Sequence, residues 1–371
     1  MPTATEALDL HRRRLLQAAA CTVVAAGVPA QAGSGRGARL LAAWDDPGAR
    51  EPHHMGLLEV DTEGRLAVLA SIALPTRAHG LVWEAASGTA LAVARRPGDW
   101  LLRWRPASPA RAAQWQWSPP QRRFNGHALR VGNRVMTTET DFDAGGRGVV
   151  VVRDAASLRE LAVWDSHGQD PHALLWDAGR QGLWVANGGI GSDLGSGRRK
   201  DLRAMDSSLV LLDAAANGAP RGQWRLDDPR LSMRHLARAD DGSVGVALQA
   251  EHDDAARRET APLLAVWQAG TLRIVDHDGI GGGYGGDIAA VDERFYVSAT
   301  RSDQVLAWSA RDRSVEWRTI DGAGALTRVD GTLWCGSDRG WTPLDQVSAT
   351  KPQPLARPGL RPDNHALGLP V

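Results

Sequence analysis

The sequence predicts a single all-β domain, a β-propeller of seven four-stranded blades, with six blades as the alternative. Two observations predict this fold. From about residue 39 the chain consists of short apolar or β-branched runs separated by Gly, Asp, Asn and Ser, with no long stretch of the 3.6-residue helical period. A block of such runs then recurs at a spacing close to the length of one propeller blade.

The first 32 residues have the pattern of an export signal. Arg12 and Arg13 precede an apolar, small-residue run over 18–28, and small residues at 30–32 offer a cleavage site. The paired arginines resemble a twin-arginine signal, with a general secretory signal as the alternative. The apolar run is too short to span a bilayer, so we expect a periplasmic protein exported in folded form, without a stable membrane anchor.

The repeated block is clearest from His79 onwards. His79 begins one apolar run, and further runs follow at 90–94, 100–104 and 113–117. Similar blocks begin at His127, His172, His235 and Asp287, and a shorter one begins at Ala325. The starts are 48, 45, 63, 52 and 38 residues apart, as expected for successive blades.

Three runs that precede the first block must supply strands for the remaining blade. They lie at 40–44, 55–60 and 66–74. We expect the ring to close by pairing strands from both chain ends, because closure removes the long open edge of a sheet. The predicted propeller spans 39–348 and is followed by a C-terminal tail, 349–371.

Composition excludes several classes of function. The 43 Lys and Arg balance the 43 Asp and Glu, which argues against nucleic acid or an anionic membrane as the main partner, because both need a basic surface. Two cysteines are too few for a disulfide scaffold or a zinc finger. The Gly281-x-Gly283-x-x-Gly286 string leads into an expected strand rather than a helix, so it lacks the helix N-terminus of a dinucleotide site.

The residues that begin the repeated blocks are candidate metal ligands. His79, His127, His172 and His235 each precede the innermost strand of a different blade, and Asp287 has the matching place in another. Equivalent positions of a propeller meet at one mouth of its channel. Imidazole and carboxylate groups there suit iron, copper or zinc, and we predict iron or copper. The alternative is that each His hydrogen-bonds neighbouring backbone.

A second set of polar residues ends the second strand of each blade on the same face. This set contains Arg95, Arg96, Glu139, Asn187 and Gln249. We predict Glu139 as a further metal ligand and the other four as binding a small molecule or cofactor, because convergent polar groups around a concavity form such sites. Long insertions at 190–206 and 251–261 follow these strands and are candidates for a lid.

A series of motifs resembles one known family. The motifs lie at 76–80, 93–98, 124–127, 137–141, 170–172, 184–190, 207–209 and 231–235. They are similar to those of the exported bacterial proteins catalogued as domain of unknown function 1513, placed with the propellers related to quinoprotein amine dehydrogenase. The resemblance implies a periplasmic role linked to iron uptake, with imelysin-like or dihaem oxidoreductase-like proteins as partners.

Three functions are compatible with this pattern. The first is a metal-binding periplasmic propeller, and the second is a scaffold that docks an imelysin-like or haem-containing partner. The third is a propeller-type dehydrogenase or hydrolase, in which Glu139 or Asp287 acts as the base.

Overall fold

The computed structural model describes residues 37–61, 65–107, 113–192, 202–337, 339–346 and 360–370. The predicted export signal, 1–32, lies outside the described residues. Within the described ranges, no helix has both the length and the apolar character needed to cross a membrane.

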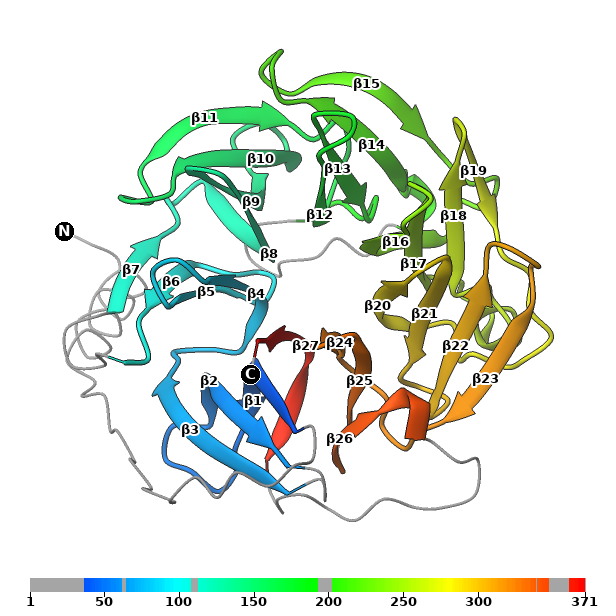
Figure 1. The fold of residues 1–371 in the computed structure, drawn as a ribbon. Helices are drawn as coiled ribbons and strands as arrows, with labels where there is room; N and C mark the ends of the chain where they lie inside the picture. The colour runs from blue at the N-terminus through cyan, green and yellow to red at the C-terminus, as the bar shows by residue number, and fades with distance from the viewer. Residues whose placement is uncertain are drawn as a thin grey trace.

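Seven antiparallel sheets surround a central axis, which confirms seven blades rather than six (Figure 1). Five consecutive blades have four strands each. They are β4 (Ala78–Glu84), β5 (Thr89–Ala94), β6 (Trp100–Trp104) and β7 (Ala113–Trp117); β8 (Arg122–Val131), β9 (Arg134–Asp141), β10 (Arg147–Asp154) and β11 (Glu160–Asp165); β12 (Pro171–Asp177), β13 (Gly182–Asn187), β14 (Ser208–Asp213) and β15 (Ala219–Trp224); β16 (Leu231–Arg238), β17 (Val244–Ala250), β18 (Leu264–Gln268) and β19 (Thr271–Ile274); and β20 (Gly285–Val291), β21 (Arg294–Ala299), β22 (Gln304–Ser309) and β23 (Val315–Thr319). In each, the first strand is the innermost.

The last two blades meet where the two ends of the chain come together. In the described residues the sixth blade has three strands, β24 (Leu326–Val329), β25 (Thr332–Ser337) and β26 (Gly340–Pro343). The seventh combines β1 (Ala38–Asp45), β2 (His53–Val60) and β3 (Leu66–Ala73) with β27 (Arg361–Leu369). Short helices, η2 (Leu202–Ala204), α2 (Ala255–Glu259) and η3 (Leu344–Gln346), lie in loops.

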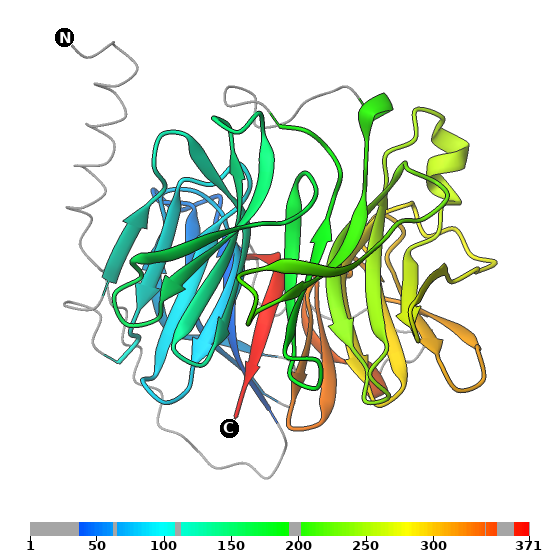
Figure 2. The same ribbon diagram turned by 90° about the horizontal axis from the view of Figure 1, so that it is seen from above.

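Strand β27 closes the ring. It pairs antiparallel with β1, with Leu41 opposite Leu367, and it lies near the axis (red in Figure 2). The predicted pairing of strands from both chain ends is therefore confirmed. The segment 349–371, which we expected to be a tail, contains this strand, so the propeller extends to Leu369. From the sequence alone, a single run of nine residues with no second strand-like run after it cannot be recognised as part of a blade.

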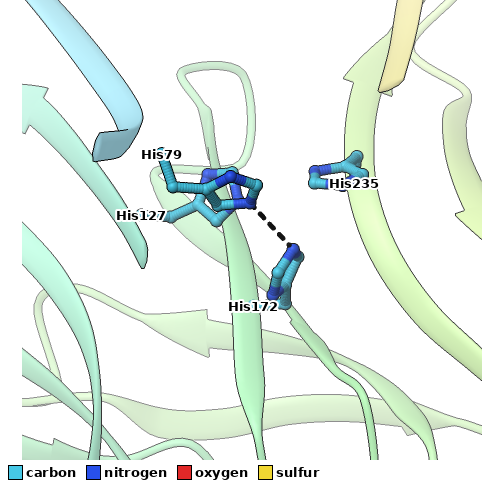
Figure 3. A group of neighbouring side chains, drawn as sticks. All are labelled: His79, His127, His172 and His235. Carbon is cyan, nitrogen blue, oxygen red and sulfur yellow. Dashed lines mark hydrogen bonds between the residues drawn. The ribbon is translucent and has the colours of Figure 1, made fainter. Parts of the chain in front are cut away.

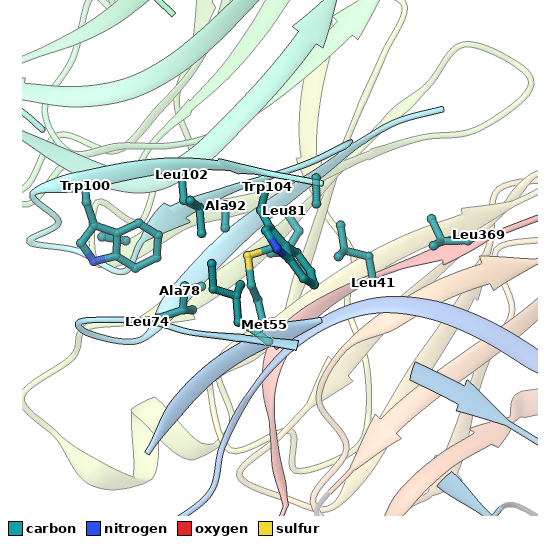
Figure 4. Close-up of a cluster of buried hydrophobic side chains, with 14 residues drawn as sticks. Leu41, Met55, Leu74, Ala78, Leu81, Ala92, Trp100, Leu102, Trp104 and Leu369 are labelled. Atoms are coloured by element: carbon teal, nitrogen blue, oxygen red, sulfur yellow. The ribbon is translucent and has the colours of Figure 1, made fainter. Parts of the chain in front are cut away.

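The burial of the strands follows their position in the blade. Inner and middle strands such as β5 are buried on both faces, because neighbouring blades cover both sides of each sheet. Outermost strands such as β11 alternate between exposed and half-buried or buried residues, as expected for a strand with one solvated face. Figure 4 shows one of the hydrophobic clusters between blades, where Met55 and Leu369 lie in the same cluster as the fully buried Trp100 and Trp104.

The innermost strands share an irregularity at equivalent positions. Their pairing shifts register between Ala78 and Leu81, Phe124 and Ala128, Pro171 and Leu174, Met233 and Leu236, and Gly285 and Ile288. On β27 the shift lies between Pro362 and Ala366. A β-bulge bends the strand and changes the direction of a side chain. His79, His127, His172, His235 and Asp287, which begin five of the predicted blocks, all lie within these bulges.

Candidate metal centre

Five imidazoles converge at the axis of the propeller. The structure brings together His79, His127, His172 and His235, as their equivalent places in the repeat predict (Figure 3), and adds His365 from β27. Ring centroids lie 4.5 Å apart for His79 and His365 and 5.9 Å apart for His79 and His235. Histidines from five blades therefore share one site.

The spacing of the ring nitrogens suits a shared ion. Each of the four predicted histidines offers one nitrogen that lies within 4.8 Å of those of the others. Nε2 of His79 is 3.4 Å from Nε2 of His172, which is long for a hydrogen bond between them. Two nitrogens bound to one metal at about 2.0–2.1 Å in tetrahedral geometry lie roughly 3.4 Å apart. The His79–His172 pair therefore already has the spacing of two ligands of one ion, and nitrogens at the outer limit of 4.8 Å would have to move closer together to share it.

Asp287 orients the fifth histidine. Its Oδ1 lies 3.2 Å from Nδ1 of His365, and it accepts hydrogen bonds from the backbone of Ile288 and of Leu326. Asp287, His235 and His365 also form a group whose ligand atoms lie within 4.8 Å. A carboxylate that holds one nitrogen of a histidine fixes the ring and makes the other nitrogen a better metal ligand.

Asp363 has a similar place behind His79. Its Oδ1 is 3.8 Å from Nδ1 of His79, and Arg77 pairs with its Oδ2 at 3.0 Å. The Arg77 guanidinium and the His79 ring help to hold the pKa of Asp363 well below its usual range, although burial acts in the opposite direction. The carboxylate therefore stays ionised behind the ring.

The histidines are mostly neutral at neutral pH. Burial lowers the pKa of His79 to about 4, and it holds the pKa values of His127, His172 and His235 well below their usual range, with neighbouring histidines adding to the effect. Burial would also lower the pKa of His365, but the Asp287 carboxylate outweighs it and raises the value. At least four imidazoles therefore present free lone pairs without losing a proton, which favours metal binding.

One nitrogen of every ring in the group lacks a hydrogen-bond partner among the described residues. These atoms are Nδ1 of His79, His172 and His235 and Nε2 of His127 and His365. A buried polar atom without a partner costs about 1–3 kcal/mol. Five such atoms in one place destabilise the fold, so a structural role does not explain the group. The unpartnered Nε2 atoms of His127 and His365 suit a positively charged ligand.

His365 was not predicted from the sequence, because its segment was expected to be a tail. A signal was present: His127 and His172 are each followed by Ala-Leu, and so is His365. The remaining blade has no ionisable residue at the matching place. There Leu326 contributes only its backbone N–H, to Asp287.

Glu139 lies outside this group. Its Oε1 accepts hydrogen bonds from Thr137 and from Arg153, both at 2.7 Å, and Arg122 is 3.9 Å from its Oε2. The carboxylate is completely buried and neutralises Arg153. We therefore leave Glu139 out of the ligand set, because an acid at the end of a second strand can face the interior of its own blade.

A cavity of about 810 Å³ lies over the histidines. Its lining includes His79, His172 and His235 together with three of the predicted small-molecule residues, Arg95, Arg96 and Gln249. The fourth, Asn187, is not in this lining. Its buried amide donates to the Ser166 carbonyl and to Ser208, which holds the preceding loop in place.

A buried charge network forms one wall of the cavity. Arg96 and Arg234 both donate to the completely buried Asp170, and Arg234 approaches Glu251 at 3.8 Å. The two guanidinium groups hold the pKa of Asp170 below its usual value despite its burial. Gly188 leaves room for this network, since a Cβ there would lie 2.7 Å from Oδ2 of Asp170.

Both insertions reach the cavity. The loop after β17 carries helix α2, which Asp254 caps by accepting from the backbone of Arg257. Arg258 of this loop lines the cavity, as does Leu202 from the other insertion. Most of the predicted 190–206 insertion, residues 193–201, lies outside the described residues.

Fold and site together define a β-propeller whose axial mouth is lined with histidines. The chain belongs to the family described as protein of unknown function (DUF1513), whose match covers residues 72–369. This match confirms the resemblance to domain of unknown function 1513 that the sequence motifs indicate.

Solved propellers share the fold at low sequence identity. A streptogramin B lyase is 10% identical, with a TM-score of 0.55 over 81% of this chain and 91% of that one. Virginiamycin B lyase from Staphylococcus aureus is 9% identical, with a TM-score of 0.54 over 81% and 96%. A candidate 6-phosphogluconolactonase from Bacteroides fragilis NCTC 9343 is 12% identical, with a TM-score of 0.55 over 92% and 100%. No curated protein matches the sequence significantly.

Proposed function

We propose that the protein binds one transition-metal ion, iron or copper, at the axial histidines. His79, His127, His172 and His235 supply the ligand set, and His365 completes it with Asp287 behind its ring. The observation that carries the proposal is the convergence of five imidazoles at the axis, four of which offer ring nitrogens within 4.8 Å of one another. Neutral imidazole is a preferred ligand of both metals.

The burial of the site supports a stably held ion. His79, His172 and His235 are buried, and the carboxylates of Asp287 and Asp363 compensate part of the charge of a bound cation. An ion that binds only the folded state stabilises it by mass action.

We further propose that this occurs in the periplasm and serves iron uptake, with imelysin-like or dihaem oxidoreductase-like proteins as partners. The pattern of residues 1–32 supports export, and the family resemblance supports the link to iron. The scaffold function remains the alternative.

Metal analysis tests the proposal directly. The full chain is produced in iron- and copper-replete cells, purified from the periplasmic extract without chelator, and analysed by mass spectrometry for iron, copper and zinc. We expect close to one equivalent of iron or copper. His127→Ala and His365→Ala should lower the occupancy several-fold while the far-ultraviolet β signature stays unchanged, because apolar packing between blades holds the ring together.

Glu139→Gln is the matched control. It changes a buried acid of the same blade as His127, so we expect it to lower stability but to leave metal occupancy unchanged. Occupancy below about one-tenth equivalent in the wild-type protein would instead favour the scaffold function, because a ligand set of this kind binds tightly when it binds at all.

A further inference from the structure

The cavity above the histidines carries more positive than negative groups. Five arginines line it, Arg95, Arg96, Arg234, Arg258 and Arg301, against two acids, Glu251 and Asp253. The acids are already engaged: Asp253 pairs with Arg230 at 2.8 Å, and Glu251 lies 3.8 Å from Arg234. A cavity with this excess of guanidinium groups attracts anions.

Two of the arginines have no carboxylate partner among the described residues. Arg95 makes no side-chain hydrogen bond or ion pair there, and Arg301 has only the ring of Tyr284, 4.5 Å from its guanidinium carbon. Stacking on an aromatic ring restrains Arg301 without neutralising it. Both guanidinium groups therefore keep their full donor capacity for a ligand.

The other arginines form a fixed wall. Arg96 and Arg234 are held by the buried Asp170, and Arg258 donates to the carbonyl of His252 at 2.9 Å. Because these groups are already positioned, a ligand loses little entropy in ordering them. The volume of about 810 Å³ is in the range of small-molecule sites.

The same cavity reaches the histidines. His79, His172 and His235 belong to its lining, so a ligand held by the arginines can also reach an ion bound there. We propose that the cavity binds a small oxyanion, carrying carboxylate or phosphate groups, with one oxygen directed to the metal and the others to Arg95 and Arg301. The contact between one ligand oxygen and the metal rests on the proposed metal site. The binding of the anion itself rests on the arginines alone.

Calorimetry with two probes tests the inference. Citrate and inorganic phosphate are each titrated into metal-free and metal-loaded protein at constant ionic strength in chloride. We expect both proteins to bind an oxyanion, the metal-loaded one more tightly. Tighter binding of citrate would identify carboxylate as the preferred group, and tighter binding of phosphate would identify phosphate.

The double variant R95A/R301A should weaken this binding at least about tenfold, or roughly 1.4 kcal/mol. Arg311→Ala is the matched control, because Arg311 is an exposed arginine on a loop between β22 and β23, paired with Glu293. Both variants change exposed side chains, and circular dichroism and thermal melting confirm that they fold.

Equal affinity in R95A/R301A and R311A would overturn the inference, as would the absence of binding heat for both probes in the wild-type protein. Failure here can be distinguished from failure of the metal site. Metal content of R95A/R301A should equal that of the wild-type protein, so loss of oxyanion binding with full metal content concerns the arginines only. Oxyanion binding by a protein that never takes up metal would refute the metal site instead.

Discussion

At the scale of single residues, the main feature is a group of histidines placed where they are weak bases. Burial disfavours the charged form of an imidazole, and the lowered pKa values of His79, His127, His172 and His235 reflect it. Such an arrangement costs stability in the metal-free protein, and binding of the proposed ion would restore that stability. The stability of the metal-free protein should therefore depend strongly on pH.

The sign follows from proton counts. An unfolded histidine has a pKa of about 6.5, whereas His79 in the folded protein has a pKa of about 4. Between these values the unfolded state binds more protons, so stability is full above about pH 6.5 and falls as the pH decreases. His365, with its raised pKa, has the opposite effect, because its contribution to stability is lost as the pH rises. It is one residue, however, against the four histidines whose pKa values are lowered.

We expect the urea midpoint of metal-free protein to be lower at pH 5 than at pH 7.5. His79 alone can contribute about 2 kcal/mol to this difference. His172→Asn should reduce the difference, because it removes one of the four groups. His167→Asn is the control: His167 lies on a loop outside the group with a φ of 55°, which Asn tolerates. The same pH dependence in wild-type protein and H172N would contradict this explanation.

Four of the five histidines could be predicted from the sequence because the repeat reveals their equivalence. The direction of a side chain at the end of the second strand of a blade could not be predicted, because neighbouring residues of a strand face opposite sides. Glu139 and Gln249 end equivalent strands, yet Glu139 binds Arg153 inside its blade while Gln249 lines the cavity.

At the scale of the strand, the β-bulges determine where the axial histidines lie. The bulges of neighbouring blades approach each other closely, and glycine makes this possible. Gly126 has a φ of 104°, and a Cβ there would lie 2.8 Å from Cδ2 of His79. At Gly80 a Cβ would lie 2.5 Å from the carbonyl oxygen of Gly126. The position of His79 thus depends on a residue of the next blade.

Gly126→Ala should therefore damage the site. We expect it to displace the His79 ring, to lower metal affinity at least several-fold and to destabilise the protein by about 1–3 kcal/mol through overcrowding and backbone strain. Metal titration and urea unfolding measure the two effects.

Gly132→Ala provides the comparison. Gly132 also has a positive φ, 57°, but a Cβ there has no neighbour within 4 Å, so only the backbone strain of about 1 kcal/mol is expected. If both variants bound metal equally well, contact with His79 would not position the site.

Strands and blades were predictable because both periods, two residues within a strand and one blade within the chain, are visible in the sequence. The β-bulges could not be predicted, because a shift of register depends on how a strand pairs with its neighbour. The sequence therefore indicated which residues face the axis but not how closely they meet.

At the scale of the whole molecule, the ring is closed by one strand. β27 is the innermost strand of the seventh blade and packs against β24 and β4 as well as β1. Without it, β1 would present an open edge at the axis, and unpaired edges promote aggregation. His365 and Asp363 would also be missing from the site.

A chain that ends at residue 359 should therefore lose cooperative thermal unfolding and elute as aggregates in gel filtration. A chain that ends at Leu369 keeps β27 intact and should behave like the full chain. A cooperative, monomeric product from the shorter chain would mean that the remaining blades close without β27.

The position of β27 also relates the site to the order of protein synthesis. The ribosome adds this strand after all the other described strands, so the nascent chain can form its earlier blades while the fifth histidine is still missing. The complete group of five histidines arises only after β27 has been made and inserted beside β1. Metal loading would then report that synthesis and folding of the ring are finished, and a prematurely terminated chain would be left without its ion.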